Sequence, residues 1–242
     1  MADLTALSDA ELCALAVAAM EADPEHDRDE SWAIVSALRR RGSQPMFDQA
    51  RAWCGARDAG LRRLGANVLG QLGPAGERPF ASVSTPLLEG LLGDPDESVV
   101  SCALTALGHL GTGDTATICA LASSPSDRVR YSVAWCLGRR HQPQALATLI
   151  ALSRDLDAEV RDWATFGLGS LADADGPEIR QALVDRLDDD DAETRAEAML
   201  GLVRRNDPRG DHAVAAALTQ PDVRSQVQEA ADLIAQRGRV DD

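Results

Sequence analysis

The sequence contains no lysine, and all 24 basic residues are arginines. The absence of lysine excludes a Schiff base on a lysine amine and the lysine of a phosphate-binding loop. The arginines are outnumbered by 39 acidic residues, so the formal net charge is −15. A protein that neutralises several phosphates of a nucleic acid needs a basic stripe on its surface. We therefore expect no nucleic-acid partner.

Aromatic residues are also scarce, with four tryptophans, three phenylalanines and one tyrosine among 242 residues. Because 45% of the residues are hydrophobic, the core must consist mainly of alanine, leucine and valine. No run reaches the roughly 18 apolar residues of a membrane helix, and the N-terminus is not basic and then apolar, as an export signal is. These absences predict a cytoplasmic protein with no membrane partner.

Features of metal, redox and hydrolytic sites are missing as well. The five cysteines are odd in number and form no C-x-x-C pair. Cys136 falls on the apolar side of a predicted helix, which is typical of a buried small hydrophobic residue. The four histidines are scattered, and the acidic run 187–192 lacks the glycine and terminal glutamate of a calcium loop. We expect no metal, no cofactor and no catalytic residue.

What the sequence does contain is a ten-residue segment that occurs six times, at intervals of 29 to 38 residues. Arginine is its second residue in five copies, leucine its ninth in five, and glycine follows that leucine in four. Repetition at this period indicates a solenoid, in which each repeat buries its apolar face against its neighbours. The copies are LRRLGANVLG from Leu61, VVSCALTALG from Val99, VRYSVAWCLG from Val129, VRDWATFGLG from Val160, TRAEAMLGLV from Thr194 and VRSQVQEAAD from Val223.

Each copy is predicted to form a helix. Counting its first residue as position 0, apolar or small residues recur at positions 0, 4, 7, 8 and 11, which lie on one side of an α-helix. In four copies an aspartate stands three residues earlier, where its side chain can cap the first turn. These caps are Asp58, Asp96, Asp157 and Asp191.

A shorter helix is predicted in every repeat, and two further helices precede the first copy. The first of these starts with a capping box formed by Ser8 and Glu11. The predicted ranges are 8–21, 29–41, 45–56, 85–92, 114–123, 142–153, 177–187 and 210–219. We expect a single domain over residues 1–242, with N-terminal capping repeats at 1–57, regular repeats at 58–205 and a C-terminal capping repeat at 206–242.

The copies resemble the short HEAT-like repeats named after phycobilisome lyases. The shared motif is D-x-x-V-R-x-x-A-x-x-A-L-G, matched by DLDAEVRDWATFGLG from Asp155 and SDRVRYSVAWCLG from Ser126. The resemblance implies an all-α fold, a right-handed α-solenoid of about seven HEAT-like helical pairs. In that family the aspartate and arginine of the motif form a hydrogen-bonding ladder between repeats. This implies architectural roles for Asp157, Arg161, Arg130 and Arg195.

The concave surface lined by the repeated helices is the expected binding site, with positions 2, 6, 9 and 10 facing it. Four of the scarce aromatic residues, including Trp163, fall in two neighbouring copies. Large rings at the centre of a concave surface are typical anchors for a partner, although they can also fill space between helices. The candidate binding residues are Tyr131, Trp135, Asp162, Phe166, Arg139, His109 and Arg63.

Three functions fit these observations. The first is a non-catalytic, monomeric scaffold or adaptor that holds a protein or peptide on the concave face. The second, implied by the family resemblance, is a bilin lyase-type subunit that attaches or handles a tetrapyrrole, with Asp162 beside Trp135 and Tyr131 contacting the pyrrole nitrogens. The third is a DNA glycosylase built on HEAT-like repeats, for which Trp163 would join Trp135 and Asp162. The lack of a basic groove argues against the glycosylase, so we expect the scaffold.

Overall fold

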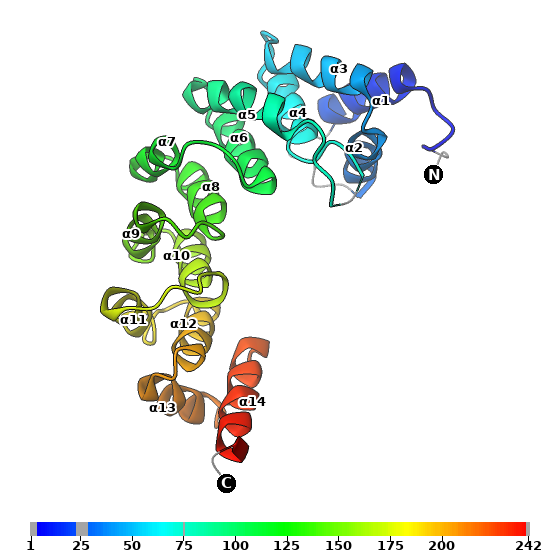
Figure 1. The fold of residues 1–242 in the computed structure, drawn as a ribbon. Coiled ribbons are helices and arrows are strands. Elements are labelled where there is room, and N and C mark those ends of the chain that lie inside the picture. Colours follow the sequence, from blue (N-terminus) through cyan, green and yellow to red (C-terminus); the bar gives the residue numbers. More distant parts are fainter. Residues whose placement is uncertain (1–3, 23–28, 75, 241–242) are drawn as a thin grey trace. The chain divides into compact units, whose positions relative to one another are not determined.

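The structure is a computed structural model that describes residues 4–22, 29–74 and 76–240. By its internal contacts the chain divides into two compact units, Met1–Asp114 (unit 1) and Thr115–Asp242 (unit 2). Over the described residues, every regular element is helical, with fourteen α-helices and no strand (Figure 1). The predicted all-α repeat fold is confirmed. The sequence-based limits of the capping repeats stay a prediction.

The described part of unit 1 contains six α-helices. The repeated segments form α4 and α6, and α4 packs against α2, α3, α5 and α6. The three helices predicted between residues 8 and 56 begin and end within two residues of the expected positions, whereas α5 begins four residues before its predicted start. The bounds are α1 Asp9–Ala22, α2 Asp29–Arg41, α3 Gln44–Cys54, α4 Ala59–Leu69, α5 Ala81–Gly90 and α6 Glu97–Leu110.

In unit 2 the described residues, 115–240, form eight α-helices in two rows (Figure 1). The repeated segments form one row, α8, α10, α12 and α14, in which each helix contacts the next. The shorter helices α7, α9, α11 and α13 form the second row, and a π-helical turn, Gly167–Leu171, continues α10. The bounds are α7 Thr115–Ala120, α8 Asp127–Leu137, α9 Pro143–Leu152, α10 Ala158–Phe166, α11 Pro177–Val184, α12 Ala192–Arg204, α13 Pro208–Ala217 and α14 Ser225–Val240.

The predicted helix starts are confirmed by their caps. Ser8 and Glu11 form the reciprocal capping box, since each side chain accepts a hydrogen bond from the other residue's backbone amide. Each of the four predicted aspartate caps accepts a hydrogen bond from an amide in the first turn, at 2.7 to 3.0 Å. They are Asp58 of α4, Asp96 of α6, Asp157 of α10 and Asp191 of α12.

Position 9 of the segment lies between neighbouring helices, so the expectation that it faces the groove is wrong. A Cβ atom on Gly169 would lie 3.2 Å from Cα of Gly201, and one on Gly138 would lie 3.6 Å from Cα of Gly167. The second glycine of each pair stands at position 7 of the following segment. The lack of side chains at both positions lets successive helices approach closely.

An arginine–aspartate ladder joins successive repeats, as the family resemblance implies. In every rung the arginine Nε and Nη2 donate to the two carboxylate oxygens at 2.6 to 2.9 Å. The arginine Nη1 donates to the backbone carbonyls five and six residues before the arginine. This bidentate arrangement is the strong form of an arginine–carboxylate contact. The rungs are Arg62–Asp94, Arg130–Asp155 and Arg161–Asp189.

The acidic member of each rung lies two residues before the helix cap. Asp155 accepts from Arg130, and it also accepts a hydrogen bond from the backbone amide of Asp157 at 2.9 Å. Asp157 is therefore architectural as a cap, and Asp155 forms the rung. Burial is the largest influence on the pKa of Asp155 and would raise it, but the hydrogen bonds from Arg130 and the amide outweigh burial and hold the pKa below its usual value.

We expect Arg161→Ala to lower the free energy of unfolding by about 1–3 kcal/mol. The carboxylate of Asp189 is only 3% exposed and would lose its bidentate partner, keeping one contact from Arg186 and one from the backbone amide of Asp191. Urea denaturation followed by circular dichroism measures the change. The control is Arg154→Ala, because the Arg154 side chain is 50% exposed and its pair with Asp185 should contribute less than about 1 kcal/mol. Equal losses in the two variants would contradict a structural role for the rung.

Candidate functional site

The structure divides the seven predicted binding residues between the two units. Tyr131 and Trp135 are on α8, Asp162 and Phe166 are on α10, and Arg139 is exposed just beyond the end of α8. These five residues belong to unit 2. The other two belong to unit 1, with Arg63 on α4 and His109 in the last turn of α6.

Three aromatic rings form a continuous surface in unit 2, which we call the aromatic face (Tyr131, Trp163 and Phe166). The Trp163 ring packs edge-on against Tyr131 with 5.8 Å between centroids, and against Phe166 with 5.4 Å. Edge-to-face packing is a favoured geometry for aromatic pairs. All three residues are half-buried, and Trp135 is one helical turn beyond Tyr131 on the same side of α8.

Trp163 is therefore the central ring, although the predicted site omitted it. It stands at position 3 of its segment, next to the positions that the sequence analysis placed on the binding surface. The signal that could have identified it was the shortage of aromatic residues itself. Four of the eight aromatic residues of the chain occur on α8 and α10.

Asp162, on α10 beside the aromatic residue Trp163, is a poorly compensated carboxyl group. It is half-buried, and its Oδ1 is buried without a hydrogen-bond partner among the described residues. Burial, followed by the charges of nearby carboxylates, raises its pKa to about 7. Those neighbours are Glu159 on α10 and Asp191, Glu193 and Glu197 at the start of and along α12.

Glu197 extends this acidic region towards α14. It is only 6% exposed, and it accepts hydrogen bonds from Ser170 at 2.9 Å and from Gln226 at 3.1 Å. Burial raises its pKa, as it does for Asp162. Glu197 and Phe166 both line a pocket of about 360 Å³ that also includes Arg204. Rings next to incompletely neutralised carboxylates are suited to a cation, which can stack on a ring and donate to an oxygen.

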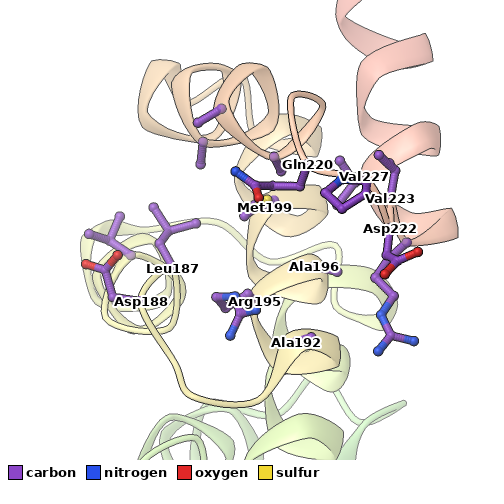
Figure 2. Close-up of a pocket in the computed structure, with 16 residues that line it drawn as sticks. Leu187, Asp188, Ala192, Arg195, Ala196, Met199, Gln220, Asp222, Val223 and Val227 are labelled. Atoms are coloured by element: carbon purple, nitrogen blue, oxygen red, sulfur yellow. The ribbon is translucent and has the colours of Figure 1, made fainter.

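A larger cavity of about 720 Å³ opens between α11, α12, α13 and the segment that leads into α14 (Figure 2). Leu187, Met199 and Val227 line it with apolar side chains, and Arg195 and Asp222 add charges. Five alanines form much of the remaining wall, and their short side chains leave this space open. The sequence analysis did not find this cavity, because the sixth repeat matches the motif only loosely.

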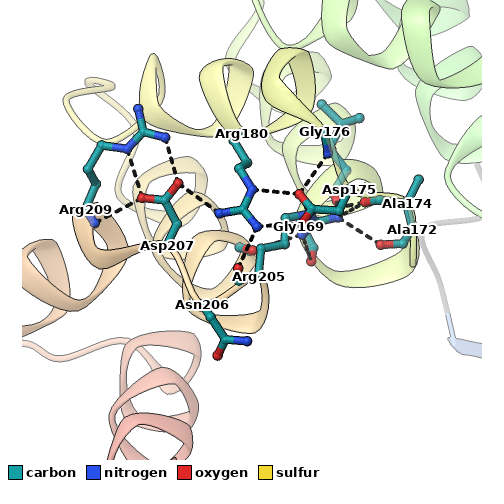
Figure 3. A network of polar contacts seen from close by, with 12 residues as sticks. Gly169, Ala172, Ala174, Asp175, Gly176, Arg180, Arg205, Asn206, Asp207 and Arg209 are labelled. Carbon is teal, nitrogen blue, oxygen red and sulfur yellow. Dashed lines mark hydrogen bonds and ion pairs between the residues drawn. The ribbon is translucent and has the colours of Figure 1, made fainter.

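A buried polar network fixes the end of α10 (Figure 3). Arg205 follows α12, is only 9% exposed and donates hydrogen bonds at 2.6 to 3.2 Å to five backbone carbonyls. Arg180 binds both Asp175 and Asp207 and donates to the carbonyl of Arg205. The five acceptors belong to Leu168, Gly169, Ala172, Ala174 and Gly201. The network thus secures the turn that directly follows Phe166.

The described residues lack the features of several other classes of site. No group of three or more His, Cys, Asp or Glu residues is placed to hold a metal ion there. No described helix is long and apolar enough to cross a membrane. The five cysteines are free thiols, and burial raises the pKa of Cys136 to about 11, which makes this thiol unreactive. The predicted burial of Cys136 is confirmed.

Comparisons with known proteins support the repeat architecture. Residues 84–169 match the family model described as HEAT repeats. Protein YibA of Escherichia coli (strain K12) is 25% identical over 192 residues, covering 76% of this chain and 68% of YibA. The X-ray structure of YibA matches with a TM-score of 0.74 at 23% identity, covering 95% of this chain and 82% of that chain.

Two further solved structures share the fold at lower identity. The archaeal HEAT-like repeats protein from Thermococcus onnurineus NA1 matches with a TM-score of 0.56 at 17% identity, covering 95% of this chain and 98% of that chain. A designed armadillo repeat protein in complex with the peptide (KR)4 matches with a TM-score of 0.50 at 16% identity, covering 74% of this chain and 94% of that chain. These likenesses show an α-solenoid fold.

Proposed function

Since this chain is a HEAT-like repeat protein, we propose that it is a non-catalytic scaffold that holds a segment of a partner protein. The contact surface is the aromatic face together with Trp135, Asp162 and Arg139. The observation that carries this proposal is the contact of three half-buried rings with each other beside Asp162, whose Oδ1 is buried without a hydrogen-bond partner among the described residues. His109 and Arg63 remain candidates for contacts made by unit 1.

The partner segment is basic. An arginine or lysine side chain can stack on a ring of the aromatic face while it donates to Asp162 or enters the pocket beside Glu197. The net charge of −15 favours the approach of a cationic partner over long range. The designed armadillo repeat protein that holds (KR)4 supports this proposal, because a related solenoid accommodates a peptide of alternating lysine and arginine.

The peptide (KR)4 is therefore a suitable probe, with binding measured by isothermal titration calorimetry. We expect saturable binding that weakens with added salt, and we expect Asp162→Asn to weaken it about tenfold, or about 1.4 kcal/mol. The matched control is Asp185→Asn, which removes a carboxylate that pairs with Arg154 elsewhere in unit 2 and should leave affinity unchanged. Equal affinities for the wild type and Asp162→Asn, or no binding, would exclude this surface as the site.

The same titration has an expected pH dependence. Asp162 has a pKa of about 7 in the folded protein, so it is largely protonated at pH 6 and largely ionised at pH 8. A bound cation stabilises the ionised carboxylate, so affinity should rise with pH across this range. The rise should be smaller in Asp162→Asn, because this variant lacks the carboxyl group whose pKa lies within the range. Tight, salt-sensitive binding of duplex DNA would instead favour the glycosylase hypothesis.

A further inference from the structure

Arg195 has the same position in its repeat as the three ladder arginines. Its Nη1 donates to the carbonyls of Asp189 at 2.6 Å and Asp190 at 3.0 Å. These carbonyls lie five and six residues before the arginine, as they do in every rung of the ladder. The anchored Nη1 therefore fixes the guanidinium of Arg195 in the orientation that the other arginines use to bind aspartate.

The other half of this guanidinium has no partner among the described residues. In each rung Nε and Nη2 hold a carboxylate, but in Arg195 neither nitrogen has a hydrogen bond or ion pair with any residue that the structure describes. The guanidinium is planar and always charged, and the fork formed by its Nε and Nη2 matches the geometry of a carboxylate. Arg195 also lines the cavity of about 720 Å³ (Figure 2).

Asp222 stands at the sequence position of a rung aspartate but does not bind Arg195. Asp155 lies three residues before the start of α10 and Asp189 three residues before the start of α12, and each fills its rung. Asp222 lies three residues before α14, yet it is exposed, lines the same cavity and forms no ion pair with Arg195. The nearby Arg224 is already paired with Glu193 at 2.6 Å. The fourth rung is therefore open.

We propose that a carboxylate from a partner peptide completes this rung. The Arg195 fork binds an aspartate or glutamate side chain of the partner, and a neighbouring apolar side chain enters the cavity against Leu187, Met199 and Val227. Charge complementarity specifies the carboxylate, and the apolar wall specifies the residue beside it. This site is separate from the aromatic face and does not depend on the proposed basic partner.

The probe is the blocked tripeptide acetyl-Leu-Asp-Leu-amide, which has one carboxylate between two apolar side chains and no basic group. Titration of the full chain, followed by ¹H–¹⁵N and methyl NMR, should give saturable shifts of the Arg195 Nε–H and the Met199 methyl signals. The matched peptide acetyl-Leu-Asn-Leu-amide should bind at least tenfold more weakly. Arg195→Gln should weaken the aspartate peptide by a similar factor, while Arg154→Gln should leave its binding unchanged.

Asp222→Asn is the decisive variant, because Asp222 is the aspartate of this chain that stands where the partner's carboxylate would bind Arg195. We expect Asp222→Asn to bind the aspartate peptide at least as tightly as the wild type, and to unfold at the same urea concentration. If Asp222→Asn is instead destabilised as much as Asp189→Asn, Asp222 closes the rung itself and the proposal is overturned. The absence of saturable shifts, or equal affinity for the two peptides, would overturn it as well.

Discussion

Replacing Arg205 with methionine should lower the free energy of unfolding by about 3–5 kcal/mol, the largest effect that we expect from a single side chain. The variant leaves backbone carbonyls at the end of α10 and in the following loop without donors, among them those of Leu168, Gly169 and Ala172 (Figure 3). A buried carbonyl that loses its donor pays its full desolvation cost, and the shape of methionine replaces only the aliphatic part of the arginine.

Arg205→Lys should recover little of this loss. One ammonium group has three donors at a single point, whereas the planar guanidinium reaches five carbonyls that are spread over two segments. The control is Arg204→Met at the adjacent position. The Arg204 side chain is 38% exposed and binds Glu229 and one carbonyl, so we expect its replacement to lower the free energy of unfolding by less than about 1 kcal/mol. Urea denaturation of the three variants tests this order. Recovery of wild-type stability by lysine would show that charge and not donor geometry holds the turn.

Loss of the Arg205 hydrogen bonds should also change the proposed binding surface. The carbonyls held by Arg205 begin two residues after Phe166, and the intervening residue is Gly167. Loosening of the turn would shift Phe166 relative to Trp163 and enlarge the pocket beside Glu197. The Arg205 network is thus a support for the aromatic face, and weaker (KR)4 binding by the folded fraction of Arg205→Met would have this cause.

The helices could be predicted from the sequence because two independent signals coincide in most repeats. Apolar residues recur at helical spacing, and in four repeats an aspartate cap precedes them, so the local pattern alone predicts caps such as Asp157 and Asp191. The rung aspartates could not be chosen in the same way. Asp155 and Asp157 both precede α10, and only the reach of Arg130 from the previous repeat determines which one it binds.

The candidate sites were less predictable for a related reason. The position of Trp163 on its helix does not show that two other rings will meet it, since that depends on how closely α8 and α10 approach. The open rung at Arg195 has no sequence signal at all, because Asp222 stands where a rung aspartate is expected. Asp222 does not pair with Arg195 because of the path that the chain takes before α14, and a local sequence pattern does not specify this path.

The close approach of the helices is itself testable at Gly201. A Cβ atom there would lie 2.6 Å from Cα of Gly169 and 3.0 Å from Cδ1 of Leu183. The Cα atom of Gly169 belongs to the backbone of the π-helical turn that continues α10. The clash can therefore be relieved only by a shift of the whole row of repeated helices. We expect Gly201→Ala to lower the free energy of unfolding by about 3 kcal/mol, the upper part of the range for an overpacked core.

Two further glycine-to-alanine variants separate overpacking from helix propensity. At Gly138 the nearest atom to a new Cβ is Cδ1 of Leu171, at 3.1 Å, and this side chain can move, so we expect a loss of less than about 1 kcal/mol. At Gly90, near the end of α5, nothing lies within 4 Å, and alanine should stabilise the protein by about 0.5–1 kcal/mol. Urea denaturation should rank the variants as Gly90, Gly138 and Gly201, from most to least stable. Gly169 has no side chain that could move aside for the new Cβ atom. An unchanged free energy of unfolding in Gly201→Ala would therefore mean that the segments at Gly169 and Gly201 lie further apart than in the structure.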